Sequence, residues 1–247
     1  MPVCLNCGSI VNTNFCPNCG QKKGVEKLTW RSFVVEIFHF FAHIEKGFLN
    51  TTWLLLIRPA KVIGEYLAGK RKKYFKPLSL YLVWVAFHVL IYQLVVGWMH
   101  YENLRTSNVL FSGGEAGTYI AKHTNLFGLL LLPILSFFSW LIVSRPKLNY
   151  IENLVTLIYI FATSEMLIVF QIIITGLLFK TNFLTNGFAI QVQIVTFIWS
   201  FFCAYVFFKT KRIRFLIPRI LLAEFFGIVV NGKLGALVAG LILKMSD

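Results

Sequence analysis

The stretch LSLYLVWVAFHVLIYQLVVGW, residues 78–98, sets the fold class of this chain. It is strongly apolar, with His88 and Gln93 as its main interruptions. A helix needs about 20 predominantly apolar residues to cross the hydrocarbon core of a bilayer. We therefore expect this stretch to be a membrane-spanning helix. Residues 1–25 show no secretory signal peptide, so this helix is expected to act as its own insertion signal.

The composition of the whole chain agrees with a membrane protein. Of its 247 residues, 57% are hydrophobic and only 14% are charged, whereas soluble domains carry about 25% charged residues. The net charge of +14 could in principle attract nucleic acid. However, the strongest basic run, residues 70–76, directly precedes the first apolar stretch. That is where the positive-inside rule places Lys and Arg, so the charge indicates membrane topology.

Four further stretches are long and apolar enough to be considered as spans. They cover residues 126–143, 154–179, 188–208 and 216–243. The last carries polar residues, and its central sequence VVNGKLG could be the turn of a hairpin that re-enters the membrane. We expect an all-α membrane protein with about five transmembrane helices, interfacial amphipathic helices and a small N-terminal zinc ribbon.

Most of the 24 Lys and Arg residues lie before the first span or in the connections that follow the second and fourth spans. These three regions lie on the same side of the membrane if the spans alternate in direction. Because basic residues concentrate on the cytoplasmic side, the sequence predicts a cytoplasmic N-terminus.

The N-terminal sequence CLNCGSIVNTNFCPNCGQKK, residues 4–23, contains two C-x-x-C pairs. In a reducing cytosol these cysteines are better suited to bind a metal than to form disulfides. Four thiolates suit one tetrahedral Zn²⁺ in a closed, structural site, which leaves no open position for catalysis. Gly8 and Gly20 follow the second cysteine of each pair, where a tight turn favours positive φ. Phe15 is expected to cover the metal site. The predicted ligands are Cys4, Cys7, Cys16 and Cys19.

Three roles are open to this ribbon: docking a partner protein, passive stabilisation, or binding nucleic acid. Its loop SIVNTN has no basic residue, which argues against nucleic acid. We therefore favour protein docking.

Residues 28–57 are rich in aromatic side chains but are interrupted by charges, which predicts an amphipathic helix in the membrane interface. Glu36, His39 and His43 share one face of such a helix. They could form a second metal site, or simply a polar face.

The sequence RPAKVIGEYLAGKRKKYFKP, residues 58–77, predicts a helix that starts at Pro59 and stops at Gly69. Its basic residues either set the topology or bind anionic headgroups of the inner leaflet, at about 1 kcal/mol for each charge. The candidate headgroup ligands are Lys70, Arg71, Lys72, Lys73 and Lys76.

The same segment contains apolar residues that we expect to contact lipid. Ile63, Tyr66 and Leu67 lie at helical spacing for a lipid-facing stripe. Tyr74 and Phe75, beside the basic run, are expected to anchor at headgroup depth.

Two motifs carry a resemblance to a known family. These are C-x-x-C-G…F-C-P-x-C-G-Q at residues 4–21 and R-P-x-x-x-I-x-E-Y-L-x-G-K-R-x-x-Y-F-x-P at residues 58–77. Together they resemble a family of bacterial membrane proteins described only as a domain of unknown function. The resemblance implies a bacterial inner-membrane protein with a cytoplasmic zinc ribbon, and it brings no activity. We expect a ribbon at residues 1–23, a juxtamembrane part at 24–77 and a membrane domain at 78–247.

Ionisable residues within apolar segments are candidates for function because they are costly at membrane depth. His88 and Glu165 lie near the middle of the first and third spans and could pair if those helices are neighbours. The ionisable residues of the apolar segments either line a path for an ion, a proton or a lipid headgroup, or only hold helices together. The remaining members, in the last span, are Arg219, Glu224 and Lys233.

No enzyme signature is evident, and we predict no catalytic residues. The favoured hypothesis is a non-enzymatic accessory or assembly protein that binds a cytoplasmic or membrane protein partner. The second is a small transporter, channel or lipid-moving protein that uses the intramembrane His and Glu. The third is a membrane enzyme acting on lipid phosphates through the basic run and the Glu36, His39 and His43 face. The sequence leaves the oligomeric state open, including a homo-oligomer.

Overall fold

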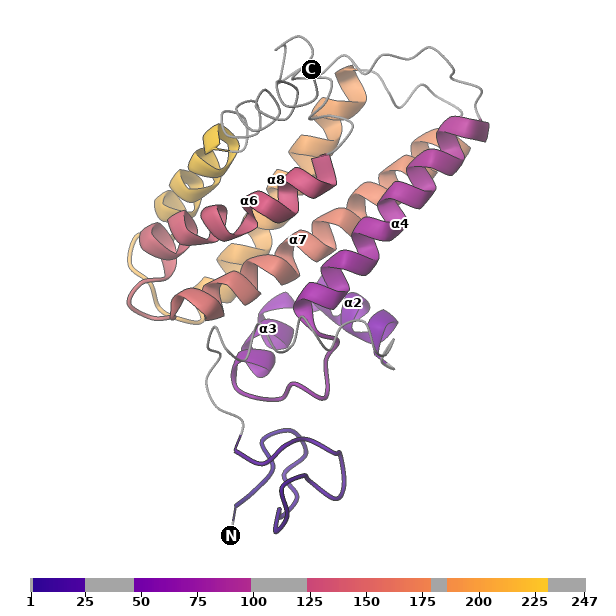
Figure 1. Ribbon diagram of the computed structural model, residues 1–247. Coiled ribbons are helices and arrows are strands. Elements are labelled where there is room, and N and C mark those ends of the chain that lie inside the picture. Colours follow the sequence, from indigo (N-terminus) through magenta and orange to yellow (C-terminus); the bar gives the residue numbers. More distant parts are fainter. Residues whose placement is uncertain (1, 25–46, 99–123, 179–185, 231–247) are drawn as a thin grey trace, which may run out of the picture.

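The computed structural model describes residues 2–24, 47–98, 124–178 and 186–230, and in the last three of these ranges the regular structure is helical (Figure 1). Two short helices come first and four long apolar segments follow. A further helix covers residues 216–230. The labelled elements are α2 (Phe48–Ile57), α3 (Pro59–Leu67), α4 (Pro77–Trp98), α6 (Thr124–Ser139) with its extension η2 (Trp140–Ser144), α7 (Tyr150–Ile172) with its extension η3 (Ile173–Leu178), and α8 (Asn186–Lys209).

Three helical stretches in the described part of the chain are long and apolar enough to cross a membrane: Pro77–Val95, Tyr150–Gly176 and Ile190–Lys209. They correspond to the first, third and fourth spans expected from the sequence. The second expected span falls in α6 and η2, where Leu130–Ser144 is a shorter apolar helix. The fifth begins with helix 216–230. Lys233 and most of the VVNGKLG turn lie outside the described residues.

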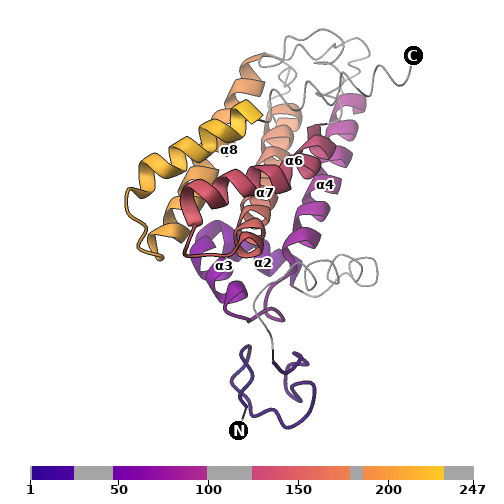
Figure 2. The same ribbon diagram turned by 60° about the vertical axis from the view of Figure 1, so that its left-hand side comes forward.

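Helix α7 is the centre of the bundle, because α4, α6 and α8 all pack against it (Figures 1 and 2). A capping box begins α7: Asn149 Oδ1 accepts the Glu152 amide at 2.7 Å, and Glu152 Oε2 accepts the Asn149 amide at 2.9 Å. This arrangement satisfies backbone donors that the first turn of a helix leaves unpaired. One turn on, the buried Asn153 side chain donates to the Ser136 carbonyl of α6 at 3.0 Å.

Helices α2 and α3 lie across one end of this bundle, where α3 packs against α7 and α8 (Figure 1). Pro59 occupies the first helical position of α3, and Gly69 follows its C-terminal end with φ +103°. Both features agree with the sequence, since Pro suits a helix start and only glycine readily adopts that φ.

Buried hydrogen bonds tie the chain that links α3 to α4 to the rest of the bundle. The Phe75 amide donates to Thr51 Oγ1 of α2 at 2.9 Å. The Tyr159 hydroxyl of α7 donates to the Phe75 carbonyl at 2.8 Å. Such bonds satisfy backbone groups that would otherwise be buried without partners.

The lipid-facing roles predicted for the apolar residues of this segment were wrong at four positions. Ile63 and Tyr66 are almost fully buried, and the Tyr66 ring packs edge-to-face on Tyr159 with centroids 5.4 Å apart. Tyr74 and Phe75 are also buried, in the same core cluster. Ile63 and Tyr66 are buried because α3 packs across the end of the bundle, where its apolar stripe contacts α7 and α8.

Helix α2 does present an apolar face to its surroundings. Leu49, Trp53 and Ile57 are each more than half exposed, and their four-residue spacing places them on one side of the helix. The opposite side contains the buried Thr51 and Leu55. This pattern fits the interfacial helix expected over residues 28–57, of which 28–46 lie outside the described residues.

The basic segments that the sequence separates meet at one end of the bundle. Residues 70–76 precede α4 and residues 145–147 join η2 to α7, whereas residues 209–214 comprise the last residue of α8 and the turn after it. In both views these three connections lie at the end covered by α2 and α3 (Figures 1 and 2).

Candidate metal centre and intramembrane polar pair

The N-terminal segment folds into two nearly identical knuckles, Cys4–Gly8 and Cys16–Gly20. In each, the amide of the first cysteine donates to the carbonyl five residues later at 2.8 Å. The glycine amide donates back to the carbonyl of that cysteine at 2.9 Å. Gly8 and Gly20 have φ of +77° and +69°, as the sequence predicted. The repeated local geometry aims the cysteine side chains of both knuckles at one point.

The four predicted thiols come together there. All four Sγ atoms lie within 4.8 Å of one another. The Cys4–Cys19 and Cys7–Cys16 sulfur pairs are each 3.6 Å apart. A tetrahedral ion with metal–sulfur bonds of about 2.3 Å places its sulfurs about 3.8 Å apart. The cluster therefore has the donor set and the spacing to hold one metal ion.

The thiols differ in how readily they ionise. Hydrogen bonds from the Ser9 hydroxyl and amide lower the pKa of Cys7 to about 6, which favours the thiolate at neutral pH. Burial raises the pKa of Cys19 to about 11. A metal must displace the Cys19 proton when it binds, so metal affinity is expected to rise with pH.

The apolar cover of the cluster is Val11. Its side chain is buried and packs with Cys4 and Cys16. Phe15, expected to take this role, is mostly exposed, so that prediction was wrong. Val11 lies between the two knuckles, whereas Phe15 pairs with Lys22 at the start of the second knuckle and faces outward.

The Gln21 side chain connects the ribbon to the turn after α3. Gln21 is buried, its Nε2 donates to the Gly69 carbonyl at 2.9 Å, and its Oε1 lies 3.4 Å from the Lys72 amide. The sequence analysis missed this contact. The sequence hinted at this contact only in that Gln21 ends the first family-like motif and Gly69 belongs to the second.

Glu65 organises the basic run. Its carboxylate accepts hydrogen bonds from Lys73 Nζ at 2.8 Å and from the Tyr74 hydroxyl, and Lys70 Nζ lies 3.3 Å away. Hydrogen bonds from Lys73 and Tyr74 lower the pKa of Glu65 to about 2. Two of the five candidate headgroup ligands, Lys70 and Lys73, therefore have an acidic partner within the chain. A role for the run in lipid binding stays a prediction.

His88 of α4 and Glu165 of α7 form a pair between neighbouring helices. His88 Nδ1 lies 2.7 Å from Glu165 Oε2, and both side chains are mostly buried. The sequence suggested this pair on the condition that the two helices are adjacent, and they are. Mutual hydrogen bonding lowers the cost of placing ionisable groups at this depth.

The other intramembrane candidates do not join this pair. The Glu224 carboxylate of helix 216–230 accepts a hydrogen bond from Ser200 of α8 at 2.8 Å. Both residues border a cavity of about 80 Å³ between α6, α7, α8 and helix 216–230. Arg219 is half-buried near the start of that helix. Glu36, His39, His43 and Lys233 lie outside the described residues.

Comparison with known proteins gives one family match. The model of a family described as "Protein of unknown function (DUF3667)" matches residues 45–89. This range contains α2, α3, the basic run and about half of α4, and it excludes the ribbon. No curated protein and no solved structure matches the chain. The match agrees with the resemblance carried by residues 58–77, and it assigns no activity.

Proposed function

We propose that this chain is a non-enzymatic accessory or assembly protein of the bacterial inner membrane, whose N-terminal zinc ribbon docks a cytoplasmic protein partner. The ribbon and the end of the bundle covered by α2 and α3 then face the cytoplasm. Clustering of the basic segments 70–76, 145–147 and 209–214 at that end supports this orientation, because Lys and Arg accumulate on the cytoplasmic side.

Zinc is the metal that suits the site best. Four thiolates at tetrahedral spacing form a saturated donor set, which is typical of structural zinc. A closed site of this kind stabilises the fold of a short segment and leaves no position for a substrate. We expect one Zn²⁺ per chain.

The observation that carries the docking role is the apolar surface of the ribbon. Val3, Leu5, Ile10 and Phe15 are each more than half exposed. Four large apolar side chains are thus exposed on one short segment, and exposed apolar side chains that lie together mark interaction sites. Gln21 holds the ribbon at the turn after α3, so a partner bound to the exposed apolar side chains would lie beside the membrane.

Three variants of the full-length protein test this role by co-purification from native membranes with metal analysis of the same sample. We expect Leu5→Ser/Phe15→Ser to keep one zinc per chain and lose the partner. Cys16→Ser should lose both zinc and partner while the spans remain inserted. Asn12→Ala, an exposed polar position of the ribbon, is the matched control and should keep both.

Two results would contradict the proposal. If Cys16→Ser protein recovers the same partners as the native chain, the ribbon is not the docking module. If the native sample contains iron in place of zinc, the assignment of the metal fails even where the four thiols are its ligands.

The His88–Glu165 pair favours a second candidate function, a small transporter, channel or lipid-moving protein. A hydrogen-bonded acid and imidazole within two candidate spans could exchange a proton or hold a cation. In proteoliposomes, Glu165→Gln should abolish a proton or cation flux that the native protein supports, and Ser164→Ala is a matched control on the same helix. Absence of flux with the native protein would leave the pair a packing contact.

The third alternative, an enzyme acting on lipid phosphates, depends on Glu36, His39 and His43 binding a second metal. The metal analysis above decides it. Two metal ions per chain would support it, whereas one would assign all the metal to the ribbon.

A further inference from the structure

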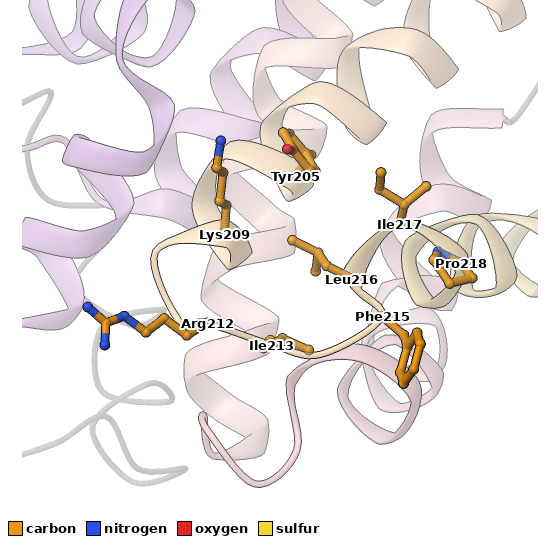
Figure 3. Close-up of a pocket in the computed structure, with 8 residues that line it drawn as sticks. All are labelled: Tyr205, Lys209, Arg212, Ile213, Phe215, Leu216, Ile217 and Pro218. Carbon is orange, nitrogen blue, oxygen red and sulfur yellow. The ribbon is translucent and has the colours of Figure 1, made fainter.

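The end of α8, the turn after it and the start of helix 216–230 line an open pocket of about 400 Å³. Figure 3 shows Tyr205 and Lys209 projecting from the end of α8 on one side and Ile217 from the next helix on the other, with Leu216 between them. Arg212 extends outward from the connecting turn. The pocket thus combines an apolar interior with cationic groups at its edge.

The basic residues of this segment form no ion pair with a carboxylate in the part of the chain that the structure describes. Residues 209–219 contain five basic residues and no acidic one. Among the described residues, the ion pairs of the structure involve Glu65 and Glu165 and none of these five cations. Lys209 Nζ lies 5.5 Å from the centre of the Tyr205 ring, a weak cation–π contact that leaves its hydrogen-bond donors available. An anion is the complementary ligand.

Helix 216–230 begins at the pocket, and the first amides of a helix also favour negative charge. This contribution is secondary to the two cations. It places a third source of positive potential on the opposite wall.

Apolar surface leads from the pocket toward the middle of the bilayer. On α8, Ile194, Ile198 and Phe202 are exposed at four-residue spacing and continue to Tyr205 and Lys209. At 1.5 Å per residue this face is about 22 Å long, whereas half of the hydrocarbon core is about 15 Å thick. The face is therefore long enough for an acyl chain of one leaflet to lie along it.

We propose that this pocket, lined by Tyr205, Lys209, Arg212 and Leu216, binds an anionic phospholipid. Lys209 holds its phosphate, Arg212 adds positive potential at the edge of the pocket, and an acyl chain lies on the exposed face of α8. The site is separate from the basic run at residues 70–76, where Glu65 pairs with two of the lysines. It uses the membrane placement proposed above and is independent of the docking role of the ribbon.

The test is native mass spectrometry of the full-length protein titrated with phosphatidylglycerol or phosphatidylcholine. The native protein should retain one phosphatidylglycerol in preference to phosphatidylcholine. Lys209→Gln/Arg212→Gln should weaken that binding at least tenfold. Lys211→Gln/Arg214→Gln removes the same charge from the same segment but does not line the pocket, and it should change binding less than twofold.

A steric variant separates the pocket from general electrostatics. Leu216→Trp keeps every charge and fills the interior, so it should also lose phosphatidylglycerol while its thermal unfolding stays close to that of the native protein. If Leu216→Trp unfolds early, Tyr205→Ala supplies the same test by removing one wall, with the same expected loss.

The proposal is overturned if the native protein does not distinguish the two lipids, or if the control pair weakens binding as much as the pocket pair. It is also overturned if the steric variants bind normally. Inorganic phosphate is the last arm: if it binds as tightly as phosphatidylglycerol, the pocket recognises a soluble anion and not a lipid.

Discussion

Replacement of Glu65 by Gln tests whether the basic run is organised by one carboxylate. Gln can still accept from the Tyr74 hydroxyl, so the substitution removes mainly the charge that Lys70 and Lys73 contact. The pKa of Glu65 falls from 4.5 to about 2 in the fold. At about 1.4 kcal/mol per pKa unit, this sets a ceiling of about 3 kcal/mol on the stabilisation.

The measured effect should be smaller, because the site is at the surface. The Glu65 side chain retains 20% of its exposure, and both lysines are more exposed. Solvent and salt screen such pairs, so we expect a loss of about 1–2 kcal/mol at pH 7. For a chain of this size that corresponds to a fall in Tm of about 3–6 °C.

The pH dependence gives the sharper assay. A lowered pKa means that the contribution is complete above pH 4.5 and is lost as the pH falls toward 2. Thermal unfolding in detergent should therefore show a difference in Tm between native protein and Glu65→Gln that is largest near pH 7 and decreases below pH 4. Lys72→Gln, an exposed cation of the same run, is the control and should shift Tm little. If the two proteins have the same Tm at pH 7, or if the Tm difference does not change with pH, the reasoning is refuted.

Three further predictions concern the contacts that join the parts of the chain. Gln21→Ala should leave the metal content unchanged but raise amide hydrogen exchange in residues 68–73 about tenfold, because it removes the acceptor of the Lys72 amide and the bond that holds the Gly69 carbonyl. Unchanged exchange would mean that the ribbon is not fastened there. Tyr159→Phe should lower the unfolding free energy by about 1–2 kcal/mol, since the Phe75 carbonyl is left buried without its donor. A fall in Tm of less than about 1 °C would contradict this. Gly69→Ala should cost about 1–2 kcal/mol in the same assay because φ of +103° strains any residue with a Cβ, and an unchanged Tm would show that the turn can rearrange.

The clustering of the four cysteines could be predicted from sequence because its geometry is local. The spacing of each C-x-x-C pair and the glycine that follows it determine where two sulfurs point, and two such units bring four sulfurs close enough to hold one ion. The helix start at Pro59 and the stop at Gly69 were predictable for the same reason, since they depend on the φ preferences of single residues. The cover of the cluster was not, because either Val11 or Phe15 satisfies the sequence and only the path of the chain between the knuckles selects Val11.

The sequence alone determined which segments are helical and apolar, because span length and hydrophobicity are properties of a continuous stretch. Only the tertiary structure decided where the apolar stripe of α3 is buried. Beside a membrane, such a stripe can face lipid or protein, and both remove it from water. The packing of α3 on α7 and α8, which buries Ile63 and Tyr66, depends on residues far apart in the chain. The His88–Glu165 pair and the Gln21 contact likewise required the placement of distant segments, which residue spacing does not contain.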